Sequence, residues 1–178
     1  MTKAHTLLGV AAAASLAAVA SADLNMTLDG FTAAGAQFGM YQSYALDADH
    51  GFLESVNGDF MLDADGENWT WCDDLCVLIA NEDLSDLHVQ IGGYSDFGAT
   101  NRFTWEFGSS GDAGTAGGGN IDVGGIDCTG YYVWIGNGYS SGGAGTWSGG
   151  IDLIGTIPAP GALALLGLGG LVARRRRA

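Results

Sequence analysis

The densest group of metal-ligand residues in this chain is the acidic turn Asp63-Ala64-Asp65-Gly66-Glu67-Asn68. Carboxylate oxygens clustered on a turn are typical of calcium sites. The EF-hand loop does not fit, because aligning Gly66 with its sixth position places Met61 first and Cys72 twelfth, where acidic residues are required. An Asx-rich turn without metal is the alternative. The sequence therefore predicts no cofactor other than calcium, in a weak, irregular site formed by Asp63, Asp65 and Glu67.

Gly138-Tyr139-Ser140-Ser141-Gly142 matches the Gly-x-Ser-x-Gly pattern of hydrolase nucleophile elbows. Such an elbow requires a strand, a sharp turn and a helix, with the catalytic His later in the chain. All three His residues precede Ser140, and no helical stripe follows it. We therefore predict a Gly-rich hairpin loop here, no catalytic residues, and a protein that is not an enzyme.

The chain has three cysteines, Cys72, Cys76 and Cys128, so a single disulfide would leave one thiol over. A disulfide is expected because exported proteins meet oxidising conditions, and the N-terminus carries an export signal described below. We predict that Cys128 pairs with Cys72 or Cys76 and joins distant strands. A local Cys72–Cys76 loop is the alternative. A metal site on these thiols is not expected, because no His lies near them at ligand spacing.

Five Trp residues offer aromatic planes that could stack on sugar rings. In a small β domain a Trp side chain more often fills the core, and we predict the core for most of them. These residues are Trp69, Trp71, Trp105, Trp134 and Trp147.

The elements that must position these residues are predicted to be short strands. Apolar and polar residues alternate in Phe103-Thr104-Trp105-Glu106-Phe107, which places them on opposite faces of a strand. The predicted strands are residues 24–28, 37–41, 69–71, 76–80, 87–91, 102–107, 131–135 and 145–154. Residues 109–125 hold seven Gly and are predicted to be a long exposed loop. Short strands, Gly-rich turns and no helical stripe predict an all-β fold, either a β-sandwich or a jelly roll.

The N-terminus has the three parts of a secretory signal peptide. Lys3 supplies a positive charge, residues 7–20 are free of charge and mostly apolar, and Ala20 and Ala22 are small residues at the positions that signal peptidase reads. We predict a signal helix over residues 1–22, with cleavage between Ala22 and Asp23, and an acidic β domain over residues 23–156.

The C-terminus has a short apolar run between prolines and arginines. Residues 161–173 carry no charge, and four Arg follow them, which is a stop-transfer pattern. A helix of this length spans only about 20 Å at about 1.5 Å per residue, less than the roughly 30 Å hydrocarbon core. We therefore predict that this short apolar helix inserts in the membrane only transiently. The tail comprises residues 157–178.

This tail resembles the PEP-CTERM sorting signal, a Pro-Glu-Pro motif followed by an apolar helix and an Arg cluster, although Ala159 stands where that family has Glu. The resemblance implies that an exosortase, a membrane cysteine transpeptidase, recognises and removes the tail as the protein is sorted to the cell surface. It also implies an envelope with an outer membrane and an exopolysaccharide-associated surface. The residues that carry it are Pro158, Ala159, Pro160, Arg174, Arg175, Arg176 and Arg177.

Two short patches in the middle of the chain resemble a second family. The segment Trp71-Cys72-Asp73-Asp74-Leu75-Cys76-Val77-Leu78-Ile79 and the segment Gly145-Thr146-Trp147-Ser148-Gly149 are similar to strands of β-sandwich modules like the proprotein-convertase P domain. The resemblance implies a jelly-roll accessory module appended to secreted proteins, without catalysis.

The domain between the two ends is strongly acidic. It contains all 20 Asp and Glu of the chain against one Arg, Arg102, hence a formal charge of about −19. Nucleic acid and anionic lipid are poor partners for such a surface, whereas cations and neutral sugars are compatible with it. We expect an exported protein of the cell envelope or extracellular matrix, with signal peptidase, an exosortase and exopolysaccharide as partners and a structural or adhesive role. A secreted carbohydrate- or calcium-binding module is the alternative.

Overall fold

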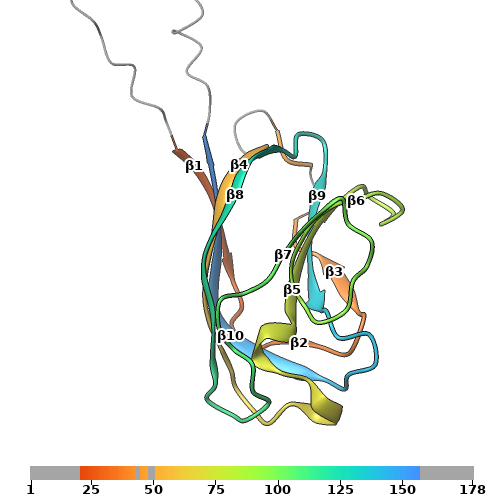
Figure 1. The fold of residues 1–178 in the computed structure, drawn as a ribbon, viewed down its shortest axis with the longest axis vertical. Coiled ribbons are helices and arrows are strands. Elements are labelled where there is room, and N and C mark those ends of the chain that lie inside the picture. The colour runs from red at the N-terminus through yellow and green to blue at the C-terminus, as the bar shows by residue number, and fades with distance from the viewer. Residues whose placement is uncertain (1–20, 43–44, 48–50, 157–178) are drawn as a thin grey trace, which may run out of the picture. The chain divides into compact units, whose positions relative to one another are not determined.

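Two β-sheets account for most of the described chain, which confirms the all-β prediction (Figure 1). The computed structural model describes residues 21–42, 45–47 and 51–156. The sorting tail and nearly all of the signal peptide therefore lie outside the described residues. The strands are β1 (Ser21–Thr27), β2 (Phe31–Ala33), β3 (Phe38–Met40), β4 (Phe52–Leu62), β5 (Leu75–Ala80), β6 (Leu87–Gly92), β7 (Asn101–Phe103), β8 (Ala116–Asp127), β9 (Tyr132–Asn137) and β10 (Gly145–Thr156).

The two sheets have five strands each. The first has the order β1-β10-β4-β8, with β2 also paired to β10, and the second has the order β3-β9-β5-β6-β7. All strand pairs are antiparallel except β6 with β7. Two single-turn 3-10 helices, η1 (Glu67–Trp69) and η2 (Cys72–Asp74), connect β4 to β5.

One hydrophobic core lies between the two sheets. Strand β4 shows why, since its buried and exposed residues alternate from Val56 to Leu62, so one face of the strand is turned inward. The first sheet contributes Met26, Leu53, Val56, Phe60, Leu62, Ile121, Val123, Trp147, Ile151 and Leu153, and the second contributes Leu75, Val77, Ile79, Val89, Ile91, Val133 and Ile135. Figure 1 shows the two sheets as facing layers.

Two predicted strands differ from the structure, and the strand β4 was not predicted. Residues 69–71 lie in the turns around η1 and η2 instead of a strand, and only the first part of 102–107 is in β7. Strand β4 was not predicted, because Asn57, Gly58 and Asp59 interrupt its apolar residues and are typical of turns. Pairing with β10 and β8 on both sides supplies the hydrogen bonds that make this segment a central strand.

The predicted loop at 109–125 is wrong over most of its length, because residues 116–127 form β8. Gly117, Gly118 and Gly119 are buried there. A Cβ on Gly117 would lie 2.6 Å from the Phe60 ring and 2.7 Å from Cys72 Sγ, so only a glycine lets these groups pack against the strand. The glycines thus mark close packing rather than a flexible loop.

The predicted signal-peptide cleavage falls inside β1. Ser21 and Ala22 pair with Thr156 and Gly155 at the end of β10. Cleavage after Ala22 would leave Asp23–Thr27 of this strand, still paired with β10. Within the described part of the chain, no helix is long and apolar enough to span a membrane.

Candidate functional site

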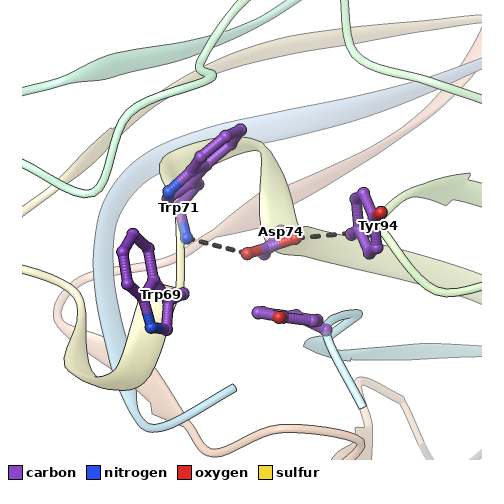
Figure 2. Close-up of a pocket in the computed structure, with 5 residues that line it drawn as sticks. Trp69, Trp71, Asp74 and Tyr94 are labelled. Atoms are coloured by element: carbon purple, nitrogen blue, oxygen red, sulfur yellow. Dashed lines mark hydrogen bonds between the residues drawn. The ribbon is translucent and has the colours of Figure 1, made fainter. Parts of the chain in front are cut away.

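Five residues that lie at or near strand ends of the second sheet surround one hollow. Strands β9, β5 and β6 are adjacent and antiparallel, so the start of β5 and the ends of β6 and β9 lie at the same end of the sheet. Trp71 and Asp74 precede β5. Tyr94 follows β6, and Tyr139 follows β9. Together with Trp69 they line a hollow of about 220 Å³, which we call the aromatic hollow (Figure 2).

Three of the four rings of the aromatic hollow are exposed, and the fourth, Tyr139, is half-buried. Trp69 is 78% exposed, Tyr94 is 75% exposed and Trp71 is 41% exposed. Large apolar groups that gather on a surface expose apolar area to water. A bound partner would bury this area, which is favourable in free energy. The clustering of these rings, more than the exposure of any one, indicates a binding site.

The backbone that carries Trp69 is strained. Asn68 and Trp69 have φ angles of 46° and 67°, in the left-handed region, which costs of order 1–3 kcal/mol for a residue other than Gly. The segment is held in place through Glu67, whose N–H donates to the Ala144 carbonyl (3.1 Å) and whose carbonyl accepts from the Gly143 N–H (3.0 Å). Strain of this kind is often found at ligand-binding sites.

Two identical Gly-Tyr-Ser segments place the tyrosines. Gly93 and Gly138 approach so closely that a Cβ on Gly138 would lie 2.4 Å from the Gly93 Cα. The Tyr94 and Tyr139 rings then pack edge to face, with centroids 5.4 Å apart. Behind them the Ser95 and Ser140 hydroxyls lie 3.0 Å apart, and the Ser95 N–H donates to the Gly138 carbonyl. Both turns are therefore fixed to each other.

Asp74 forms the floor of the aromatic hollow and joins its parts. The side chain is only 3% exposed. Its two carboxylate oxygens accept hydrogen bonds from the backbone N–H groups of Trp71 (2.7 Å) and Tyr94 (3.2 Å), as Figure 2 shows. Its carbonyl accepts from the Gly138 N–H (2.7 Å). Burial, with a smaller contribution from the Asp73 charge, raises the pKa of the Asp74 carboxyl to about 6.

A second hollow of about 500 Å³ adjoins the first and shares Trp71, Asp74 and Tyr94 with it. Its other lining residues include Asp73 and Arg102, the only Lys or Arg between residues 23 and 156. Arg102 supports the Tyr94 turn, because its guanidinium donates to the carbonyl oxygens of Gly93 (3.2 Å) and Tyr94 (2.9 Å). The residues that line the two hollows supply aromatic, acidic and hydroxyl groups.

The five Trp residues divide between core and surface. Trp105 and Trp147 are buried in the core, whereas the other three are not, so the prediction of the core for most of them is wrong. Trp134 is half-buried on the other face of β9, away from Val133 and Ile135. Trp69 and Trp71 line the aromatic hollow, which agrees with the sugar-stacking alternative.

The three predicted calcium ligands contact three different segments. Asp63 accepts from the Ser148 hydroxyl, Asp65 from the Ala113 N–H (2.8 Å) and Glu67 from the Ala144 N–H (3.5 Å). Among the described residues, no group of three or more His, Cys, Asp or Glu is arranged to hold a metal ion. The calcium site stays a prediction.

The structure does not form the predicted disulfide, because all three cysteines are buried free thiols. Cys72 contacts Gly117 at the start of β8, whereas Cys128 directly follows the end of β8. At about 3.3 Å per residue, this strand separates them by roughly 30 Å, far beyond the ~7 Å Cα–Cα limit for a disulfide. Cys76 pairs with Gly136 near the end of β9, whereas Cys128 lies near the start of that strand. Burial raises the pKa of the Cys72 and Cys128 thiols to about 12.

Ser140 of the Gly-x-Ser-x-Gly segment lies in the turn after β9, with Ser95 as its hydrogen-bond partner. His88 lies at the other end of β6, where its ring stacks on Tyr131 with centroids 4.7 Å apart. The segment is a loop, as predicted, but it is not a hairpin, because it connects β9 and β10 in different sheets. Tyr139 within it lines the aromatic hollow, which the pattern match did not indicate.

The fold and the aromatic hollow define an all-β protein with a candidate ligand-binding site at one end of its sheets. Comparison with protein-family models, curated proteins and solved structures finds no match to this chain.

Sequence reasoning missed Asp74, Tyr94 and Tyr139. A signal was present, because Gly-Tyr-Ser occurs at 93–95 and again at 138–140, each directly after a strand. Two copies of an aromatic turn at equivalent strand ends suggest a shared surface. Asp74 had no such signal among 20 acidic residues, since only burial distinguishes it.

Proposed function

We propose that this chain is an exported, non-enzymatic protein of the cell envelope or extracellular matrix whose β domain binds glycans through the aromatic hollow. The observation that carries the proposal is the gathering of exposed Trp and Tyr rings around the buried Asp74 carboxylate. Sugar rings have apolar C–H faces that pack on aromatic planes, and their hydroxyls donate to carboxylate oxygens. The adhesive role expected from the sequence thereby acquires a specific surface.

The strand order supports a jelly roll as the frame for this site. When the short strands β2 and β7 are set aside, every connection except β5 to β6 crosses between the sheets. The first sheet then holds β1, β4, β8 and β10, and the second holds β3, β5, β6 and β9. Each sheet mixes early and late strands, as two Greek keys produce. Lectin domains use jelly rolls, and the resemblance to P-domain-like modules implies the same architecture.

Replacing Trp69 or Tyr94 with alanine is expected to weaken glycan binding about tenfold or more, because each exposed ring would lose its stacking partner. Binding would be located with a glycan array and quantified by calorimetry on the purified full-length chain. The matched control is Phe52→Ala, which removes an exposed ring beside the Asp127 end of β8. An array that stays blank at high protein concentration, or equal losses in all three variants, would refute the proposed site.

Export and sorting rest on the two chain ends and on the PEP-CTERM resemblance. Replacing Arg174, Arg175, Arg176 and Arg177 with serine is expected to abolish tail removal and surface display, because both the stop-transfer charge and the recognised cluster are lost. Cell-surface labelling and the mass of the processed protein measure this. Four Lys at the same positions keep the charge and separate simple membrane retention from Arg recognition. Unchanged processing in the Ser variant would contradict sorting by this tail.

A further inference from the structure

The aromatic hollow contains a carboxylate, that of Asp74, which forms no ion pair with any residue that the structure describes. Among the described residues, the Asp74 carboxylate accepts hydrogen bonds only from the backbone N–H groups of Trp71 and Tyr94, which carry no formal charge. Arg102, the only Lys or Arg of the β domain, directs its guanidinium to the carbonyl oxygens of Gly93 and Tyr94 instead. The hollow therefore offers an anion surrounded by apolar rings.

An anion of this kind favours a cationic ligand for two reasons. A charge removed from water interacts strongly with an opposite charge, because the local dielectric is low. Trp and Tyr faces attract ammonium groups through their electron-rich surfaces, which adds to the attraction of the carboxylate. The formal charge of about −19 on the β domain acts in the same direction, since it concentrates cations at the surface and repels acidic polymers.

Resting on the proposed glycan-binding function, we propose that the ligand is an amino sugar with a free, protonated amine, part of a hexosamine polymer without its acetyl groups. The sugar ring packs on Trp69 and Trp71, and its ammonium lies over Asp74 within reach of the Tyr94 and Tyr139 rings. A neutral or acidic glycan leaves the Asp74 charge without a partner and binds more weakly.

The charge state of Asp74 makes this binding sensitive to pH. The carboxyl is ionised above its raised pKa of about 6 and neutral below it, so attraction for a cation is present above pH 6 and lost as pH falls through that value. The ionisable groups around it are Asp73 beside it on η2, Cys76 on β5, Arg102 on β7, and Tyr94 and Tyr139 on the two turns.

A matched pair of ligands tests the inference. Short oligomers of glucosamine and of N-acetylglucosamine have the same rings and linkages and differ only in the amine. With the full-length chain at pH 6.5 and physiological salt, calorimetry is expected to show the free-amine oligomer binding about tenfold tighter or better. Asp74→Asn is expected to remove this preference while affinity for the acetylated oligomer remains.

Trp69→Ala keeps every charge of the protein and separates the site from general attraction to an acidic surface. Both oligomers should bind several-fold more weakly in this variant, because both lose the ring that stacks on the sugar. A free-amine oligomer that keeps its full affinity for Trp69→Ala binds by general charge attraction, and this result overturns the inference. Equal or tighter binding of the acetylated oligomer, with loss in Trp69→Ala, also overturns it but leaves glycan binding through the hollow intact.

An oligomer with N-trimethylated amines, which stays cationic at every pH, gives an independent readout if Asp74→Asn does not fold. Its affinity for the unmodified chain is expected to fall several-fold between pH 7.5 and pH 5, while affinity for the acetylated oligomer stays level. A flat profile for the cationic oligomer, or no binding of either oligomer, overturns the inference. The glycan array then decides separately whether the hollow binds another class of sugar.

Discussion

Replacing Trp147 with alanine is expected to lower the free energy of unfolding by about 3–5 kcal/mol. The Trp147 side chain is fully buried between the sheets, and its ring lies 6.4 Å from that of Phe31. Its indole N–H donates to the Cys72 carbonyl (3.0 Å), so it ties β10 to the η2 turn beneath the aromatic hollow. Truncation would leave a large cavity and remove one of the two hydrogen bonds to the Cys72 carbonyl, which also accepts from the Leu75 N–H.

Urea denaturation followed by far-ultraviolet circular dichroism measures this loss. Trp69→Ala is the control, because the same truncation at a 78% exposed position should change the free energy of unfolding by no more than about 0.5 kcal/mol. If the two variants were equally stable, the burial of Trp147 and the position of the core would be wrong.

Replacing Gly118 with alanine is expected to cost about 3–6 kcal/mol, enough to unfold much of the protein. Gly118 has φ +123°, a conformation that side chains rarely adopt, and an added Cβ would lie 2.0 Å from the backbone oxygen of Gly58. Neither backbone can move easily, since Gly118 exchanges hydrogen bonds with Phe107 and receives one from the Glu106 N–H. The cost of the backbone strain and the cost of the steric overlap with Gly58 therefore add in the free energy of unfolding.

The control for this change is Gly39→Ala in β3, where an added Cβ meets nothing within 4 Å. That variant is expected to stay within about 0.5 kcal/mol of the original protein in the same denaturation experiment. If Gly118→Ala proved as stable as Gly39→Ala, the close pairing of β4 and β8 would be contradicted.

The aromatic hollow links these stability arguments to the proposed function. The hydrogen bond from Trp147 supports the Cys72 carbonyl, and two residues later Asp74 forms the floor of the hollow. A core variant could therefore lose glycan binding indirectly. For this reason the ring-removing variants of the binding experiments are placed at exposed residues, Trp69 and Tyr94, whose replacement leaves the core intact.

The strands with the clearest local pattern were predictable from the sequence. Leu87-His88-Val89-Gln90-Ile91 alternates and forms β6, and Tyr131–Ile135 is apolar and largely forms the central strand β9. These patterns reflect which face of a strand is buried, and the residues involved are neighbours in the chain. The all-β class and the acidic character followed from such local information.

The tertiary structure alone decided which Trp residues are buried, where the cysteines lie and that three consecutive glycines form a strand. Gly117–Gly119 have no side chains to show a pattern, and their burial depends on Phe60, Cys72 and Glu106, which pack against them from elsewhere in the chain. Likewise, Tyr94 and Tyr139 meet only because both β6 and β9 pair antiparallel with β5, which places the ends of β6 and β9 at the same end of the sheet. Contacts between distant segments create this site, and a pattern within one segment cannot report them.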